Sequence, residues 1–480
     1  MCGPSNISVD NIVERLAPYK IPILRLGHPA RLLPSVLNLS LDILTQTSDA
    51  GGLVKDIRKE MDQKQASIKK TRNGRERRAI YLDIKDLRKE YRAREHQCVD
   101  TLVQQSKIIL ATLHGAGGHQ LRGQNFDVVI IDEASQALEA QSWIPLLKAK
   151  KVVLAGDHLQ LAPTVKSLNN HSKRVPTGTS KSTPSSKHAI SSSKENATSL
   201  SSSAPASTQS RNPEITLETT LFSRLLSLHG PTIKRMLKTQ YRMHSLICAF
   251  PSISLYNNEL VSSPSVASRL LTALPYPVAD TDTTREPLIF YDTQGGDFPE
   301  SSALPPEGGV PPEGGGGKKS IMLADSKSNV AEAMIAARHV RELVEAGVKG
   351  EDIAVITPYN AQVALLAGLL KDSHPEVELG SVDGFQGREK EVVVLTLVRS
   401  NVDESAGGGG RATGIKDAEV GFLAEKRRLN VGMTRPKRQL VVIADSETVG
   451  KGSKFLKEWM AFLEEKAEVR YPDAGEVLGG

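Results

Sequence analysis

The chain has 480 residues and a formal net charge of +6, with 39% hydrophobic and 24% charged residues. This length can bury more than one hydrophobic core, so two domains with additional segments are expected. The three cysteines, Cys2, Cys98 and Cys248, are far apart and form no CxxC pair, which argues against a disulfide framework and against a zinc site.

The modest basic excess fits a polyanionic partner, whereas an evenly spread excess would indicate only solubility. No apolar run approaches the length that spans a membrane, and the opening MCGPSNISVD lacks the regions of a signal peptide. We therefore expect a protein of the cytosol or the nucleus.

The first part of the chain alternates strand and helix signals. A polar turn, GPSN at residues 3–6, precedes a helical stripe over Ile7–Ala17, and the free N–H groups of such a terminus suit a phosphate. Ile21–Leu26 and Lys107–Ala111 are typical of core strands. Leu41–Val103 between them is helical and dense in charge, which usually indicates the solvated faces of long paired helices, with nucleic-acid contact as the second interpretation.

Two further apolar runs, Phe126–Glu133 and Lys151–Asp157, predict strands buried on both faces. Asp132 and Glu133 then fall at the carboxyl end of the first run, where an open parallel sheet binds its ligands. Two such acids suit nucleotide hydrolysis, because one can hold Mg²⁺ through water and the next can activate a water. The plainer interpretation is two acids in a solvated turn. The second run ends in GDHLQLAP, which places Gln160 beside the acids and favours the catalytic interpretation.

After Pro163 the composition changes. Lys166–Asn212 is a Ser/Thr/Pro/Lys tract with few apolar residues, so we predict that it is disordered. A second interruption, Ser301–Lys319, contains GGGGKKS. This segment does not match a phosphate-binding loop, because Pro312 takes the first glycine position of GxxxxGK[ST] and Lys319 takes the hydroxyl position.

The second half repeats the alternation of strand and helix. Helical periodicity returns over Leu217–Leu228, and Met236–Phe250 contains QYRMH. Predicted strands are Pro287–Asp292, Asp352–Thr357, Glu391–Val398 and Leu440–Ala444, and Asn329–Ala346 predicts a helix. Two sets of parallel-strand signals predict an α/β protein with two doubly wound parallel sheets. The arginine-rich segment Gly421–Arg438 is either a solvated basic face or the source of an arginine for a γ-phosphate.

These signals predict a first domain at residues 1–165, with a basic helical insertion at 31–105. A disordered insertion at 166–213 follows, and residues 214–235 return to the first domain. The second domain is predicted at 236–465, with flexible loops at 301–320 and 402–416, and residues 466–480 form a tail.

Five segments resemble, in order, the motifs of superfamily-one helicases: DEAS at 132–135, GDHLQLAP at 156–163, QYRMH at 240–244, SVDGFQGREKE at 381–391 and RRLNVGMTRPKR at 427–438. The subgroup is that of the nonsense-decay and immunoglobulin-mu-binding helicases, and PSNISVDNIVERL with ILRLGHPARLLPS is more similar to the latter. The resemblance implies two RecA-like domains, ATP and Mg²⁺ as cofactors, 5′-to-3′ translocation on single-stranded DNA or RNA, and unwinding of duplexes.

The resemblance also implies roles for individual residues. Asp132 would bind Mg²⁺ through water, Glu133 would activate the hydrolytic water, and Gln160 would contact the γ-phosphate. Tyr241 would stack on the adenine, Glu389 would hold the ribose, and Arg242 and Arg435 would be the arginine fingers. Positions that touch the nucleic-acid backbone in the family are Pro4, Ser5, Asn6, Thr112, Thr357, Pro358 and Ser381. Backbone contacts predict low sequence specificity.

The chain also departs from the family pattern. The family's phosphate-binding loop should precede Pro4, and no GxxxxGK[ST] occurs in the sequence. Leu159, Ala162 and Pro436 replace residues common in relatives. We therefore expect an amino-terminally truncated helicase whose own ATPase activity is near background. The alternatives are a non-catalytic nucleic-acid-binding remnant and a scaffold of the same fold.

Overall fold

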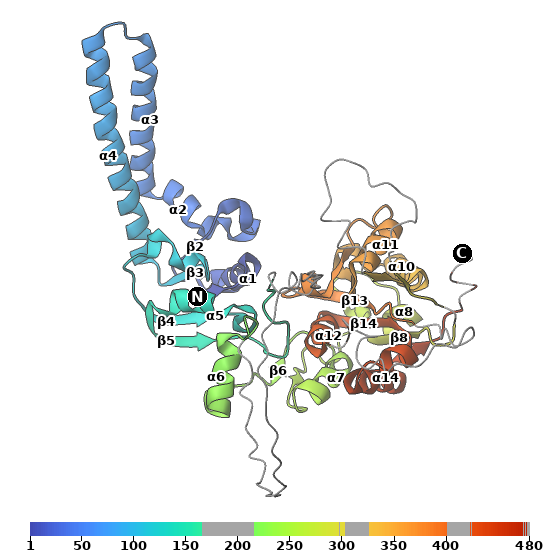
Figure 1. The fold of residues 1–480 in the computed structure, drawn as a ribbon. Helices are drawn as coiled ribbons and strands as arrows, with labels where there is room; N and C mark the ends of the chain where they lie inside the picture. The colour runs from blue at the N-terminus through green and yellow to red at the C-terminus, as the bar shows by residue number, and fades with distance from the viewer. Residues whose placement is uncertain are drawn as a thin grey trace, which may run out of the picture.

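The structure is a computed structural model that describes residues 1–165, 216–296, 298–302, 326–400, 425–473 and the single residues 423, 475 and 477. The predicted disordered insertion, the GGGGKKS segment and the predicted 402–416 loop lie outside the described residues. The described part forms two parallel sheets with helices around them (Figure 1). This arrangement confirms the predicted α/β fold class.

The first sheet has five parallel strands in the order β2-β3-β1-β4-β5. The strands are β1 (Cys2–Gly3), β2 (Ile23–Leu26), β3 (Ile108–Thr112), β4 (Phe126–Ile131) and β5 (Ala149–Leu154). Its helices are α1 (Asn6–Leu16), α5 (Glu139–Leu146) and α6 (Leu221–His229). The predicted strands are present, but the central strand β1 was not predicted, because its two residues stand in a polar opening with no periodicity.

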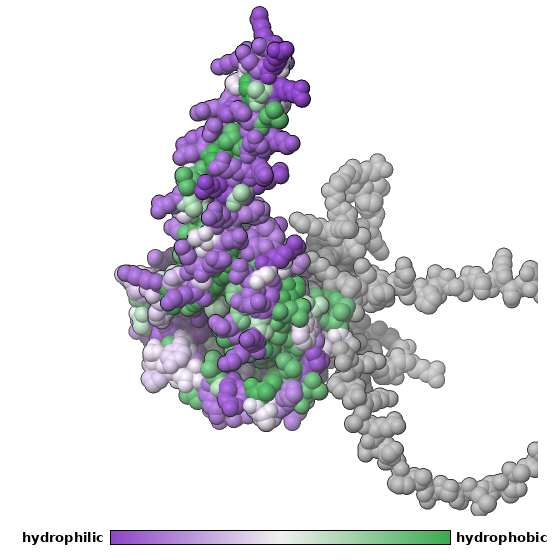
Figure 2. Space-filling view, turned by 90° about the vertical axis from the view of Figure 1, so that its left-hand side faces the viewer, coloured by the Kyte–Doolittle hydropathy of each residue, from purple (hydrophilic) through white to green (hydrophobic). Residues whose placement is uncertain are grey.

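A long helical hairpin leaves this sheet (Figure 1). It consists of α2 (Leu41–Thr47), α3 (Asp49–Lys70) and α4 (Gly74–Gln105). Asn73 caps α4 by accepting a hydrogen bond from the Arg75 N–H at 3.0 Å, so the chain reverses sharply there. Met61, Ile84 and Cys98 are buried, and mostly hydrophilic side chains, with the exposed Leu53 and Leu82 among them, lie on the outside of the hairpin (Figure 2). The predicted helical pair with solvated faces is therefore confirmed.

The second sheet has six parallel strands in the order β12-β11-β13-β14-β8-β15. The strands are β8 (Leu288–Asp292), β11 (Ile353–Thr357), β12 (Glu378–Ser381), β13 (Lys390–Thr396), β14 (Pro436–Ala444) and β15 (Glu468–Arg470). The helices are α7 (Ser245–Leu255), α8 (Asp282–Arg285), α10 (Val330–Glu345), α11 (Asn360–Leu370), α12 (Lys426–Met433), α13 (Ser446–Gly450) and α14 (Lys454–Lys466). Short strands occur outside this sheet at β6 (Thr239–Gln240), β7 (Val261–Ser262), β9 (Ser301–Ser302) and β10 (Lys327–Ser328).

The second sheet buries both of its faces. Leu395 of β13 belongs to a core that includes Trp459 of α14, whereas its neighbour Val394 belongs to a separate core that includes Ile335 of α10. Successive residues of a strand point to opposite faces, so an unbroken apolar run is required when helices cover both sides. This is why the strands of this domain could be read from the sequence.

Two predictions about the domains differ from the structure. The runs of β4 and β5 are not buried on both faces, because Val128, Val152 and Val153 are 43%, 40% and 50% exposed. No helix among the described residues covers these three side chains to the extent seen in the second sheet. The predicted tail at 466–480 contains β15, which pairs with β8 through Val469 and Phe290, so the second sheet extends further along the chain than expected.

Among the described residues, no helix is long and apolar enough to cross a membrane.

Candidate active site

Two adjacent acids follow β4 at the carboxyl edge of the first sheet. The Asp132 N–H donates to the Cys2 carbonyl at 2.8 Å, which ties this turn to the central strand. Glu133 has a left-handed backbone with φ of 50°, which is uncommon for a residue other than glycine, and its carboxylate accepts a hydrogen bond from the Gln136 amide. The turn therefore presents both predicted acids at the edge where parallel sheets bind ligands.

The loop after β5 packs directly against this turn. The Ala134 N–H donates to the Ala155 carbonyl at 2.8 Å. Gly156 has φ of 157°, and a Cβ atom there would lie 3.0 Å from the Ala134 nitrogen. Only glycine allows this approach without a shift of the backbone. The contact brings the loop that carries Asp157 and Gln160 beside the acidic turn, and Asp157 lies close enough for its charge to raise the pKa of Glu133.

The electrostatic environment of the acids favours a cation. Burial raises the pKa of Asp132, while the backbone at Glu133 and the Arg15 charge lower it in part. Burial and then the Asp132 charge raise the pKa of Glu133, with Asp157 adding to the effect. A cation beside these groups would favour their charged forms.

The described residues contain no group of three or more His, Cys, Asp or Glu side chains arranged to hold a metal. This described part of the chain therefore offers carboxylates but no complete cage. Mg²⁺ commonly binds through one or two carboxylates, with waters and substrate phosphates completing its shell. Asp132 and Glu133 fit this kind of site.

Arg435 connects the acids to the second domain. It lies between α12 and β14, is only 2% exposed, and donates from Nη2 to the Gln160 Oε1 atom at 3.3 Å. Burial lowers its pKa to about 10, Arg242 also lowers it, and Glu133 and Glu389 raise it. The guanidinium thus stays charged near neutral pH, within the electrostatic reach of Glu133.

Arg242 and Glu389 form an ion pair beside Arg435. The Arg242 Nε atom donates to Glu389 at 2.7 Å, and its Nη1 atom donates to the Thr434 carbonyl at 3.1 Å. Burial alone would raise the pKa of Glu389, but Arg242 and Lys437 outweigh burial and hold that pKa below its usual range. The expected ribose ligand and the expected arginine finger therefore contact each other, and the neighbouring Tyr241 is 70% exposed.

Both halves of the chain are similar to known proteins. Residues 1–168 and 217–447 each match a family model described as an AAA domain. The DNA polymerase alpha-associated DNA helicase A of Schizosaccharomyces pombe is 46% identical over 474 residues, which covers 99% of this chain and 60% of that protein. The chain belongs to the superfamily-one helicases.

Two other relatives support this family membership. The protein of the same name from Saccharomyces cerevisiae is 40% identical over 501 residues, covering 100% of this chain and 62% of that protein. The DNA-binding protein SMUBP-2 of Rattus norvegicus is 42% identical over 473 residues, covering 98% of this chain and 40% of that protein. The chain thus spans between 40% and 62% of the length of these relatives.

The residues expected to touch nucleic acid lie in two groups. Gly3 pairs with Thr112 between β1 and β3, which places Pro4, Ser5 and Asn6 beside Thr112 at the edge of the first sheet. Ser5 caps α1 by accepting from the Ser8 N–H at 3.1 Å.

Thr357 pairs with Ser381 between β11 and β12, so these two residues and Pro358 share the edge of the second sheet. Thr357 and Pro358 are buried, whereas Ser381 is half-buried. The first group is therefore the more accessible of the two.

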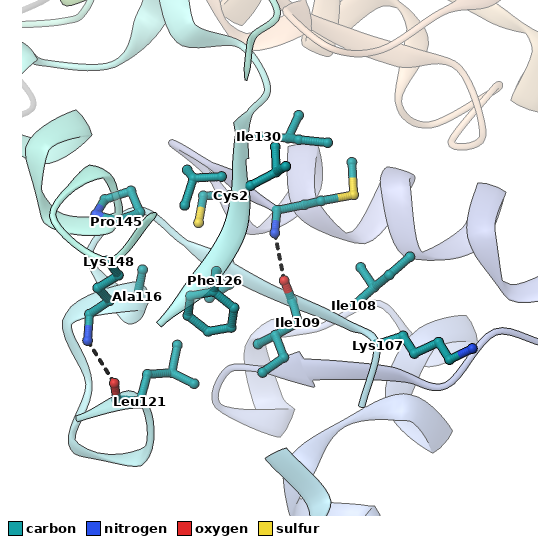
Figure 3. Close-up of a pocket in the computed structure, with 14 residues that line it drawn as sticks. Cys2, Lys107, Ile108, Ile109, Ala116, Leu121, Phe126, Ile130, Pro145 and Lys148 are labelled. Atoms are coloured by element: carbon teal, nitrogen blue, oxygen red, sulfur yellow. Dashed lines mark hydrogen bonds between the residues drawn. The ribbon is translucent and has the colours of Figure 1, made fainter. Parts of the chain in front are cut away.

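The first domain also has a cavity of about 190 Å³ away from these groups (Figure 3). It lies between the starts of β3 and β4 and is lined mainly by apolar residues, among them Ile109, Phe126 and Val128. The Met1 amino group donates to the Ile109 carbonyl at 2.7 Å, and Lys148 donates to the Leu121 carbonyl at 2.7 Å. None of the predicted site residues lines this cavity, so we separate it from the active site.

Three residues of the site were not predicted. Asp157 follows an apolar strand just as Asp132 does, so the same signal could have identified it. Asn430 lies within the arginine-rich segment, but an asparagine among arginines carries no signal of its own. Tyr256 ends α7 outside every motif, and only the tertiary structure shows that its hydroxyl donates to Asp157 at 2.5 Å.

Proposed function

We propose that this chain is the motor core of an ATP-dependent helicase, with the nucleotide site formed by the acids of the first domain and the arginines of the second. The observation that carries the proposal is the contact between Gln160 and Arg435, since it joins the loop after β5, which packs against the acidic turn, to a buried arginine of the other domain. Nucleotide hydrolysis between two domains needs negative charge to hold a metal on one side and positive charge to stabilise phosphate on the other.

The residues would share the chemistry as follows. ATP with Mg²⁺ supplies a γ-phosphate that is transferred to water. Asp132 would hold the metal through water, and Glu133, whose raised pKa makes it a better proton acceptor, would orient and deprotonate the attacking water. Gln160 and Arg435 would bind γ-phosphate oxygens, and Arg242 would add a second positive charge. Tyr241 and Glu389 would hold the adenine and the ribose.

The nucleic-acid site would run along the carboxyl edges of both sheets. Its members would be Pro4, Ser5, Asn6 and Thr112 on the first sheet and Thr357, Pro358 and Ser381 on the second. Contacts to the sugar–phosphate backbone imply binding of single-stranded DNA or RNA with low sequence specificity, and 5′-to-3′ translocation with unwinding of duplexes. The affinity of the chain for nucleic acid should fall steeply as salt rises, because binding releases the cations that had condensed on the strand. Such a protein would work in the nucleus or the cytoplasm.

Steady-state phosphate release with single-stranded DNA tests the proposal. We would compare the chain with a form to which a phosphate-binding loop is added at the amino terminus, each with and without Glu133→Gln. We expect near-background turnover by the chain itself and DNA-stimulated turnover by a form that carries a phosphate-binding loop. Glu133→Gln should reduce that turnover by about a hundredfold or more, while Glu345→Gln on α10 should leave it unchanged.

The second candidate function is nucleic-acid binding without catalysis, and the sequence favours it because it contains no GxxxxGK[ST] segment. Fluorescence anisotropy with labelled oligonucleotides separates the two. Salt-sensitive binding of DNA without Glu133-dependent turnover in either form would support the binding protein. Robust turnover by the chain itself would show that the nucleotide site lies elsewhere.

A further inference from the structure

A chain of hydrogen bonds crosses from the second domain to the loop after β5 of the first. Asn430 of α12 donates from Nδ2 to the Tyr256 hydroxyl at 2.8 Å and to the Leu159 carbonyl at 3.0 Å. Tyr256 in turn donates to the Asp157 Oδ2 atom at 2.5 Å, and Gln160 donates from Nε2 to the same oxygen at 3.1 Å. Two residues of the second domain thus hold Leu159 and Asp157 of the first, and Asp157 in turn binds Gln160.

The direction of every bond in this chain is fixed by chemistry. A carboxylate only accepts, so the Tyr256 hydroxyl must donate its single proton to Asp157 and can only accept from Asn430. The Leu159 carbonyl also only accepts, which sets the orientation of the Asn430 amide. Burial raises the pKa of Tyr256, and the Asp157 charge raises it further, so this hydroxyl keeps its proton.

Asp157 also determines how Gln160 is oriented. Because Asp157 occupies the Gln160 amide nitrogen, the Oε1 atom remains to face Arg435, which can only donate. If Asp157 moved, the Gln160 amide nitrogen would lose its acceptor, and the bond from Arg435 alone would hold the side chain. The position of Asp157 therefore restrains the orientation of Gln160 at the predicted γ-phosphate site.

Local structure holds Tyr256 in place. It ends α7, and the next two residues, Asn257 and Asn258, have left-handed backbones with φ of 53° and 58°. Asparagine tolerates this conformation better than most residues. The Asn258 N–H donates to the Ser252 carbonyl at 2.7 Å and closes the turn. The hydroxyl is thus presented by a defined helix end, and Asn430 is fully buried.

We propose that Tyr256, supported by Asn430, is a positioning residue that couples domain closure to the orientation of Gln160 through Asp157. The contact exists only when the two domains stand at the separation seen here, so opening of the domains would release Asp157 and with it Gln160. This inference rests on the proposed function for the role of Gln160, whereas the cross-domain contact stands on its own.

Hydrogen exchange without nucleotide tests the contact. Tyr256→Phe removes only the hydroxyl, and we expect faster exchange of the amides at 157–161, although these belong to the other domain. Tyr276→Phe is the matched control, because the Tyr276 hydroxyl donates to Asp352 at the same 2.5 Å but within the second domain. It should leave residues 157–161 unchanged. Unchanged exchange there in Tyr256→Phe would overturn the inference.

A double-mutant cycle tests the positioning of Gln160. The probe is a fluorescent mant-ATP with Mg²⁺, titrated into the full chain. Tyr256→Phe should weaken binding about tenfold, the size expected for one hydrogen bond to a charged group. In a Gln160→Ala background the same change should cost less than about twofold, because the residue through which it acts is gone.

The outcomes separate the two proposals. Faster exchange at 157–161 with additive effects of Tyr256→Phe and Gln160→Ala on affinity would overturn the positioning role. Faster exchange in a chain that does not bind mant-ATP, even with a phosphate-binding loop added, would overturn the proposed function and keep the contact. Both expected results together would establish Tyr256 as the link between the domains.

Discussion

The two parallel sheets have similar sequences and different surroundings. The runs of β4 and β5, FDVVII and AKKVVL, look much like the runs of β13 and β14. Yet β13 and β14 are buried by helices on both faces, while Val152 and Val153 of β5 are 40% and 50% exposed. An apolar run therefore predicts a strand, but its coverage depends on what packs against it.

The difference extends to what stabilises each sheet. The second is held by two apolar cores, one on each face. The first contains a fully buried ion pair, in which the Arg25 Nε atom lies 2.7 Å from Asp10, and Asp10 also accepts from the Leu33 N–H at 3.0 Å. We therefore expect the stability of the first sheet to depend more on a few buried polar contacts, and the stability of the second sheet to depend more on the apolar side-chain volume packed in its two cores. Four predictions test this contrast.

The largest effect is expected at Asp10. Asp10→Ala leaves the Arg25 guanidinium buried without its charge partner, so the free energy of unfolding of the first domain should fall by about 3–5 kcal/mol. Native-state hydrogen exchange of β2 and β3 measures it separately from the second domain. Asp62→Ala, which removes an exposed partner of Arg58 on α3, should leave exchange unchanged. A similar loss of unfolding free energy in both variants would mean that the buried ion pair contributes no more to stability than the exposed one.

Leu395 offers the corresponding change in the second sheet. Leu395→Ala empties a fully buried position in the core shared with Trp459, and should lower the free energy of unfolding of this domain by about 2–5 kcal/mol. Urea unfolding followed by Trp459 fluorescence is the measurement. Leu369→Ala on α11, where the side chain is partly exposed, is the control and should cost far less.

Glu332 should make the second domain sensitive to pH. Burial raises its pKa from 4.5 to about 8, against the hydrogen bonds from Thr396 and Val398, while Asp445 and Glu300 raise it further. The folded state then binds the proton more tightly than the unfolded state. Its contribution to stability is complete below pH 4.5 and is lost as pH rises towards 8. Glu332→Gln should remove this slope, which is at most about 1.4 kcal/mol per pH unit.

Urea midpoints measured from pH 5 to pH 9 check the slope, and Glu345→Gln on the exposed side of the same helix should keep it. A slope that persists in Glu332→Gln would assign the pH dependence to another group.

The smallest effect is expected at Val153. Val153→Ala on β5 should change the free energy of unfolding of the first domain by no more than about 0.5 kcal/mol, because half of the side chain is already in water. The same substitution at the fully buried Val442 of β14 should cost about 1–3 kcal/mol. Equal losses at the two positions would show that the exposed face of the first sheet is covered in solution.

Much of the fold could be predicted because it rests on local patterns. Apolar runs identified most strands of both sheets, and the charged helical stretch identified the α3–α4 hairpin. The strands that were missed are short: Cys2–Gly3, Glu378–Ser381 and Glu468–Arg470 have two to four residues each, too few to show a period. They are strands because longer neighbours offer them hydrogen bonds.

The candidate site was predicted in part for a similar reason. Acids and arginines at strand and helix ends carry a chemical signal, so the sequence alone determined the alternation of an α/β protein, the acidic turn of Asp132 and Glu133, and the positive charge of Arg242 and Arg435. It could not determine that Arg242 pairs with Glu389 or that Arg435 meets Gln160. Only the tertiary structure decided these contacts, the exposure of β5 and the link from Tyr256 to Asp157. Each of these features depends on which segments, distant in the sequence, come into contact. The hydrophobic period of a segment shows which of its own faces is apolar, but it carries no information about the residues that will cover that face.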